Sequence, residues 1–182
     1  MKTKITYGLI LASVGIVLRL ISFLLGYETD KAGSITFVSI MLGVMSFAAW
    51  CVLIWLGIRA VRDERPDQCL TYGQGLGAGV IIALVAAVVG AVYVLIHITV
   101  INPNFVENAL EMTRQKMAGR GLPEEQMEMA LKITRFTMHP AILAVGGFIG
   151  SMVLGTVVSL IAAAIVKRAP QPQPAAQVPP PL

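Results

Sequence analysis

Four long apolar runs occupy most of the chain and constrain its fold more than any other feature. They cover roughly residues 5–26, 34–58, 75–101 and 141–166, and none of them contains Asp or Glu. Each run has 22 to 27 residues, and a helix of about 20 residues already crosses the hydrocarbon core of a bilayer. Membrane-barrel strands alternate apolar and polar residues over about 10 residues, which these Gly- and Ala-rich runs do not do. The sequence therefore predicts an all-α membrane protein with four transmembrane helices.

The composition agrees with this fold class. The chain of 182 residues is 56% hydrophobic and 13% charged, whereas globular proteins average about 25% charged residues. We expect a single four-span transmembrane domain over residues 1–169. Residues 170–182 contain six of the ten prolines, which predicts a disordered, proline-rich cytoplasmic tail with polyproline II character.

Residues 103–139, between the third and fourth spans, have the pattern of an extramembrane amphipathic helical hairpin. Residues 105–118 place apolar side chains on one face of a helix. The glycines at 119 and 121 end that helix, and Pro123 begins a second one at its preferred first position. Five of the nine methionines lie here. Thioethers bind Cu(I), but they also fill irregular interfaces, and the second role is the one we expect.

Basic residues flanking the spans predict the orientation of the protein. One side would carry Lys2, Lys4, Arg59, Arg62, Arg65, Lys167 and Arg168. The other side has Lys31 in its short first loop, and its longer segment balances five basic residues with five glutamates. Lys and Arg in short loops favour the cytoplasmic side. Both termini are therefore expected in the cytoplasm.

The order of several short motifs resembles a known family. Residues 71–75 read TYGQG, Asn102-Pro103 ends the third run, residues 121–126 read GLPEEQ, and the last run ends in Lys167-Arg168. This arrangement is similar to a family of small four-span bacterial inner-membrane proteins classed as a domain of unknown function. The resemblance implies a multi-pass protein of the bacterial inner (cytoplasmic) membrane. It implies no activity, cofactor or catalytic residue.

A few polar side chains inside or beside the spans form a candidate cluster. Under the predicted topology Arg19, His97 and His139 all lie in the outer half of the bundle, and Tyr93 precedes His97 by one helical turn. A charged residue within a membrane is costly and often marks a functional site. Two simpler interpretations stay open. Arg19 could extend to the interface or make a structural hydrogen bond, and the two histidines could lie apart.

Small residues recur along the last two spans and predict close helix packing. The third run contains Gly73, Gly77 and Gly79, and the fourth contains Gly147, Ser151, Gly155 and Ser159 at four-residue spacing. Small residues let helix backbones approach in lipid, where packing drives association. We expect spans three and four to pack on each other or on a neighbouring copy. No phosphate-binding motif completes the glycine cluster.

The sequence contains no catalytic or metal-binding motif, so we expect no enzyme activity, no cofactor and no metal site. A structural, accessory or interaction role in the membrane needs only a stable bundle and a docking surface. The alternative is a small oligomeric channel or transporter, although no carboxylate lies within the spans. The expected partners are the lipid bilayer and either a second copy or another membrane protein, with no nucleic acid.

Overall fold

The computed structural model describes residues 1–27, 37–120 and 123–168, and this part of the chain is helical. Its elements are α1 (Lys2–Leu24), α2 (Phe37–Asp63), α3 (Tyr72–Ile96), the π-helical turn η1 (His97–Ile101), α4 (Phe105–Ala118), α5 (Glu124–Thr137) and α6 (Pro140–Val166). No strand occurs among the described residues, which confirms the predicted all-α class for them. The predicted tail, 170–182, lies outside the described residues.

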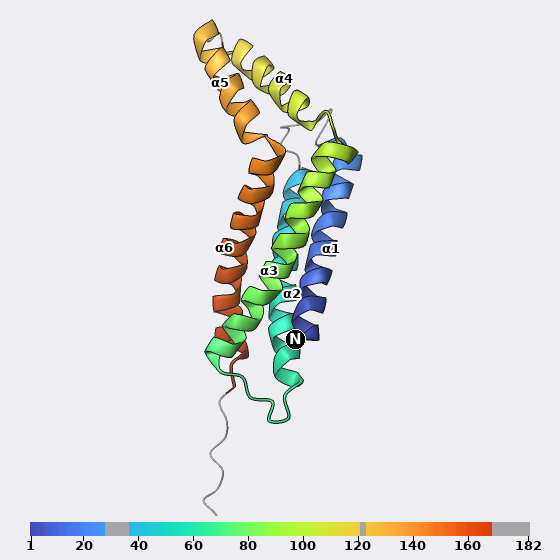
Figure 1. Ribbon diagram of the computed structural model, residues 1–182, viewed down its shortest axis with the longest axis vertical. Coiled ribbons are helices and arrows are strands. Elements are labelled where there is room, and N and C mark those ends of the chain that lie inside the picture. The colour runs from blue at the N-terminus through green and yellow to red at the C-terminus, as the bar shows by residue number, and fades with distance from the viewer. Residues whose placement is uncertain (28–36, 121–122, 169–182) are drawn as a thin grey trace, which may run out of the picture.

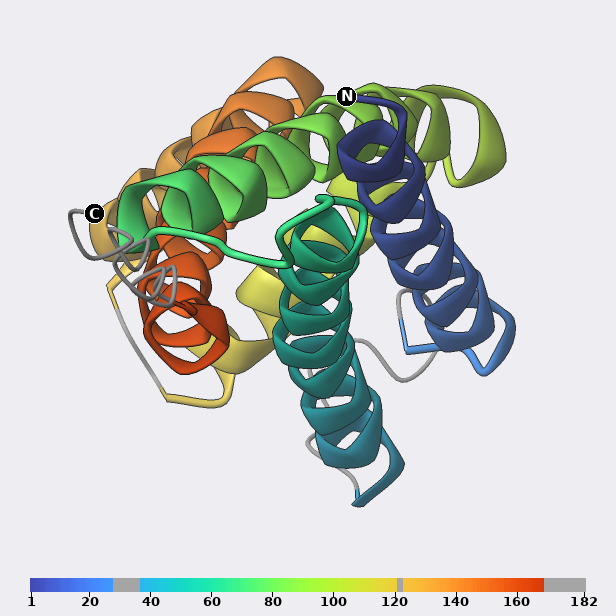
Figure 2. The same ribbon diagram turned by 90° about the horizontal axis from the view of Figure 1, so that it is seen from below.

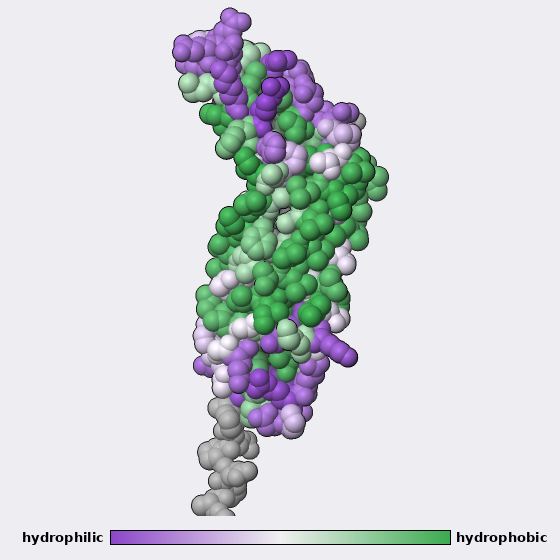
Figure 3. Space-filling view, viewed as in Figure 1, coloured by the Kyte–Doolittle hydropathy of each residue, from purple (hydrophilic) through white to green (hydrophobic). Residues whose placement is uncertain are grey.

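Four of these helices form an elongated bundle: α1, α2, α3 with η1, and α6 run side by side (Figure 1). All four are long and apolar enough to cross a membrane. The surface of the bundle is a broad apolar band with hydrophilic residues at both ends (Figure 3). Val44, Val153 and Ile165 are each more than half exposed within that band. An apolar surface of this extent is stable in contact with the hydrocarbon chains of lipids. The four predicted apolar spans are therefore confirmed as candidate membrane helices.

Two helices extend differently from their predicted limits. The first helix begins at Lys2 and ends at Leu24, and Gly26 then turns the chain with a φ of 83°. The second continues to Asp63, beyond its expected end at residue 58, because residues 59–65 contain no Gly or Pro that would end the helix. Its last turn is supported by Arg59 Nε, which lies 3.7 Å from Asp63 Oδ2. Residues 34–36 lie outside the described residues.

Helix α3 begins with a side-chain cap. The Thr71 hydroxyl accepts a hydrogen bond from Gln74 N at 3.4 Å, and Gln74 Oε1 accepts one from Thr71 N at 3.2 Å. This reciprocal capping box satisfies two backbone donors that the first turn of a helix cannot satisfy itself. Arg65 Nη1 donates to the same Gln74 Oε1 at 2.8 Å. The α2–α3 connection is therefore tied to the start of α3.

The hydrophobic core lies in the half of the bundle that contains the chain start. Ile54, Ile58 and Ile82 are completely buried there. The most extensive helix contact joins α3 to α6, and α1 and α2 complete the bundle, as the view along its axis shows (Figure 2). In contrast, no residue of α2 between 37 and 53 is buried. The bundle is thus tightly packed in one half and open in the other.

The tightly packed half ends in a group of basic residues, which we call the basic end. It comprises Lys2, Lys4, Arg59, Arg62, Arg65, Lys167 and Arg168. An antiparallel bridge joins Leu70 to Arg168, with N–H···O distances of 3.1 and 3.0 Å in the two directions. The Thr3 hydroxyl also donates to Glu64. These hydrogen bonds hold the segment between α2 and α3 against the beginning of α1 and the end of α6.

The helices α4 and α5 lie beyond the opposite end of the bundle, between η1 and α6 (Figure 1). They pack on each other, with the Thr113 and Thr134 hydroxyl oxygens 3.4 Å apart. Leu110 is the buried residue at this contact. Pro123 precedes α5 as its N-cap, with an extended ψ of 149°, so the helix begins one residue later than expected, at Glu124.

Candidate functional site

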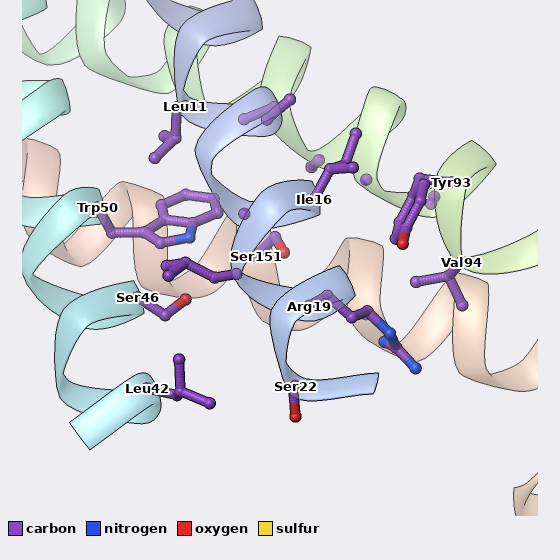
Figure 4. Close-up of a pocket in the computed structure, with 18 of the residues that line it drawn as sticks. Leu11, Ile16, Arg19, Ser22, Leu42, Ser46, Trp50, Tyr93, Val94 and Ser151 are labelled. Carbon is purple, nitrogen blue, oxygen red and sulfur yellow. The ribbon is translucent and has the colours of Figure 1, made fainter. Parts of the chain in front are cut away.

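A cavity of about 590 Å³ occupies the open half of the bundle, between α1, α2, α3 and α6 (Figure 4). Its walls combine small, apolar and polar side chains. The polar residues are Arg19, Ser22, Ser39, Ser46, Tyr93 and Ser151. This cavity brings two of the predicted cluster residues, Arg19 and Tyr93, into one wall.

Glycines help to keep the cavity open. Gly15, Gly43, Gly90 and Gly147 line it, one from each of the four helices. A Cβ atom added at any of them would meet no heavy atom within 4 Å. Larger side chains at these positions would therefore have room to occupy the space. The cavity exists partly because the sequence places no side chain there.

The cavity is closed toward the basic end. Leu11, Ala12 and Ala86 form an apolar floor, and each is more than nine-tenths buried. Below them lies the hydrophobic core around Ile54 and Ile82, both without exposed surface. No polar path crosses this core in the described part of the chain. A ligand could therefore enter the cavity only from the open half of the bundle.

Arg19 contributes the basic side chain of the cavity wall. It extends from α1 toward the side on which Tyr93 and Val94 of α3 lie (Figure 4). Placing a guanidinium at a membrane centre costs roughly 2.5–3.5 kcal/mol on insertion scales. Arg19 lies five residues before the end of α1 at Leu24, about 7.5 Å of helix. Its position is thus in the upper part of the apolar band rather than at its centre.

Tyr93 and His97 form a direct contact one helical turn apart. The Tyr93 hydroxyl lies 3.0 Å from His97 Nδ1, and their ring centroids are 5.4 Å apart. Phe23 of α1 meets the His97 ring edge-on at a centroid distance of 5.4 Å. The His97 side chain is completely buried. This aromatic cluster fastens the end of α1 to the end of α3, directly beside the cavity that Tyr93 lines.

The helix changes its hydrogen bonding at His97. From His97 to Ile101 the backbone adopts the π-helical pattern, and Asn102 N donates to His97 O at 2.7 Å. Such turns are rare and occur often at functional sites. The Asn102 side chain is also buried, and its Nδ2 has no hydrogen-bond partner among the described residues. Tyr93 and His97 could be recognised as a polar pair from their spacing in the sequence, but no local pattern indicates the π-helical turn.

His139 occupies a different position from the other three residues of the candidate cluster. It is exposed and caps α6, with Nδ1 accepting a hydrogen bond from Ala141 N at 3.3 Å. It does not line the cavity. The structure thus places Arg19 and Tyr93 in the wall of one cavity, and Tyr93 also contacts His97. His139 lies apart from them and caps the start of α6.

The α3–α6 interface uses one of the two glycine rows of α3. An added Cβ at Gly79 would lie 2.7 Å from Ser159 Cβ, and one at Gly155 would lie 3.6 Å from Ala83 Cα. Gly73 and Gly77, which we also expected to pack, are exposed and have open space beside them. Gly147 and Ser151 line the cavity instead. The row that packs contains Gly75, Gly79 and Ala83 on α3, and Gly155, Ser159 and Ala163 on α6.

A second apolar surface lies on α5. Met129, Ile133 and Phe136 are 60%, 58% and 69% exposed, and their spacing places them on one side of the helix. On the other side of α5, Leu131 and Thr134 are half-buried toward α4. The signal was present in the sequence, since three large apolar residues recur within two turns. We call Met129, Ile133 and Phe136 the α5 stripe.

A charged cleft of about 370 Å³ lies along the contact between α4 and α5. Its walls carry Glu107, Glu111, Arg114, Glu128, Lys132 and Arg135 around Leu110 and Leu131. Arg114 Nη1 lies 3.8 Å from Glu111 Oε2, and both side chains are more than half exposed. Exposed pairs of this kind contribute little to stability. The described residues contain no group of three or more His, Cys, Asp or Glu that could hold a metal ion.

Comparison with known proteins gives one match. The model of a family described as "Protein of unknown function (DUF4199)" matches residues 6–168. This range begins in the first turns of α1 and ends after α6, so it covers most of α1, all of the other α-helices and the residues that line the cavity. No curated protein and no solved structure matches the chain.

Proposed function

Because the chain belongs to the family described as Protein of unknown function (DUF4199), we propose a role for it from its own geometry. It is a multi-pass protein of the bacterial inner membrane, with four spans and both termini in the cytoplasm. It acts as an accessory protein that binds another membrane protein, and it is not an enzyme. The observation that carries this proposal is the exposed α5 stripe on a pair of helices outside the apolar band.

The charge distribution supports the orientation. The basic end carries seven Lys and Arg residues and three acidic ones, Asp63, Glu64 and Asp67. The helices α4 and α5, with residue 120, carry five basic and five acidic residues. Basic residues close to membrane helices favour the cytoplasmic side. In this orientation α4 and α5 form an extramembrane hairpin on the outer side.

The α5 stripe is suited to a protein partner. Large apolar side chains that are exposed together mark interaction surfaces, and the half-buried side of α5 is already occupied by α4. A helix that lies on a lipid surface is usually rich in Lys and Arg on its polar face. In contrast, α5 has three glutamates and two basic residues. Its acidic first turns favour a protein surface over lipid headgroups.

The cavity does not favour the alternative, a channel or transporter formed by a single copy. Conduction needs a continuous path, and the core around Ile54, Ile58 and Ile82 is completely buried. Among the described residues no carboxylate lines the cavity, although proton-coupled transporters commonly use one within the membrane. A path through this protein would therefore have to form between copies.

Gentle extraction of the intact complex from native membranes tests the accessory role. We expect the mass of the extracted species to exceed that of the chain and to include a second membrane protein. Met129→Gln, Ile133→Gln and Phe136→Gln together should release that partner. The control changes three exposed residues of the same helix, Glu125, Lys132 and Arg135, to Gln and should retain it. Extraction as a monomer or homomer, or a partner retained by the stripe variant, would contradict the proposal.

A further inference from the structure

We propose that the cavity between α1, α2, α3 and α6 is a binding site for one phospholipid molecule. The lipid phosphate binds at Arg19, and an acyl chain extends along the wall toward Leu11. This inference is independent of the accessory role, because it concerns the bundle and not the α5 stripe. Three observations carry it: the polarity of the cavity from one end to the other, its length and its charge.

The polarity of the wall changes along the cavity. Near the ends of the helices that face α4 and α5, it contains Arg19, Ser22 and Ser39. At the opposite end it is formed mainly by apolar groups, Leu11, Ala86 and the Trp50 ring, with the hydroxyls of Ser46 and Ser151 beside that ring. A free hydrophilic solute would leave this apolar end unfilled, since polar groups lose hydrogen bonds with water there. An amphiphile matches both ends at once.

The length of the cavity corresponds to one leaflet. On α1 it extends from Leu11 to Ser22, and on α2 from Ser39 to Trp50. Each interval is eleven residues, which is about 16 Å of helix. Half of a hydrocarbon core is about 15 Å. The cavity thus begins near the membrane surface and ends near the midplane, where the packed core starts.

The charge of the cavity suits a phosphate. Arg19 is the one charged side chain among the described residues of the lining, and a guanidinium binds phosphate oxygens through parallel N–H donors. Its five N–H donors allow it to bind a phosphate while keeping other hydrogen bonds. Ser22, one turn further along α1, also lines the cavity and has a hydroxyl donor. A phosphate is common to all glycerophospholipids, so the site requires no particular headgroup beyond it.

Photocrosslinking of the full chain tests the site. The protein is reconstituted in vesicles of phosphatidylethanolamine and phosphatidylglycerol that contain a trace of phosphatidylglycerol with a diazirine on its acyl chain. Crosslinked peptides are then mapped by mass spectrometry. We expect a concentrated set of crosslinks on residues 11–22 and 86–94, in addition to weak, dispersed labelling of the lipid-exposed surface.

Two glycines of α6 provide a matched pair of variants. Gly147 lines the cavity and Gly150 does not, and both have open space for a side chain. Gly147→Leu should fill the cavity and remove the concentrated crosslinks, whereas Gly150→Leu should leave them unchanged. Equal yields from the two variants would overturn the proposal, because labelling would then come from surface lipid alone.

Substitutions at Arg19 test the phosphate contact. Arg19→Gln should lower the crosslinking yield about tenfold, the effect of losing roughly one charge-assisted hydrogen bond, and Arg19→Lys should retain most of it. Circular dichroism of each variant verifies that the helices are intact. A large excess of inorganic phosphate should have no effect; if it abolished the crosslinks, the site would bind a soluble anion and the lipid assignment would be wrong. If the Arg19→Gln variant gave the same crosslinking yield as the wild type, the proposed contact between Arg19 and the phosphate would be wrong.

Discussion

Gly79 of α3 lies directly against Ser159 of α6, so that a Cβ atom on Gly79 would come within 2.7 Å of the Ser159 Cβ. Ser159 is completely buried, and its hydroxyl donates to Gly155 O at 2.6 Å within its own helix. The hydroxyl is thus satisfied without crossing the interface. This contact lets the α3 and α6 backbones approach closely, which is the main source of association between helices in lipid.

A side chain at Gly79 should therefore destabilise the bundle. We expect Gly79→Val to lower the free energy of unfolding by about 1–3 kcal/mol, because overpacking forces the helices apart. Gly77→Val, two residues earlier in the same helix, is the control, since a Cβ there meets open space. Thermal unfolding in detergent measures both. A Gly77 variant that unfolds at as low a temperature as the Gly79 variant would argue against the close contact.

Loss of the Tyr93 hydroxyl should destabilise the contact between α1 and the end of α3 beside the cavity. Tyr93→Phe keeps the ring contact with His97 but removes the hydroxyl that lies 3.0 Å from Nδ1. A hydrogen bond of this kind contributes about 1 kcal/mol. We expect a lower unfolding temperature and faster hydrogen exchange in η1. Tyr72→Phe, at an exposed position, should change neither quantity.

Removal of the Thr71 cap should weaken the beginning of α3. Thr71→Ala eliminates the side-chain acceptor for Gln74 N, a change that costs about 0.5–2 kcal/mol in helices of known proteins. Thr71→Ser retains the hydroxyl and should behave like the wild type. Hydrogen exchange of residues 72–76 reports the effect directly. Equal exchange in the Ala and Ser variants would show that the cap makes no contribution.

Thiol labelling of intact cells tests the proposed orientation. In a chain with Cys51 and Cys69 changed to Ala, single cysteines replace two exposed lysines, Lys116 in α4 and Lys167 after α6. With the outer membrane made permeable, an impermeant maleimide should label Lys116→Cys and leave Lys167→Cys unlabelled. After lysis it should label both. The reverse pattern would place the basic end outside and would contradict a cytoplasmic C-terminus.

Several features of the fold followed from the residues alone. The helix over 105–118 was predicted with the limits that α4 has, because an amphipathic pattern and two following glycines are local signals. The extension of α2 to Asp63 was missed. The apolar run ends at residue 58, but Arg and Asp are compatible with helix, and only Pro66 prevents its continuation.

The candidate site was predicted less completely. Tyr93 and His97 are one turn apart on one helix, so their contact could be anticipated from spacing. Arg19 and Tyr93 come from different helices, and no local pattern indicates that they share a cavity. His139 was grouped with them because it is polar and close to the same membrane surface, but its hydrogen bond to Ala141 N is a local capping interaction. The α5 stripe is hard to recognise in the sequence, because the opposite face of α5 also carries apolar residues.

The sequence by itself determined the four apolar spans and the two amphipathic helices between the third and fourth, because the length and the one-sided polarity of a helix are properties of consecutive residues. Only the tertiary structure decided that Gly75 and Gly79, rather than Gly73 and Gly77, face α6, and that a cavity remains beside Arg19. The physical reason is that α3 and α6 are apolar on every side. Hydrophobicity cannot orient such helices about their axes, and the fit of small residues against the neighbouring backbone does so instead.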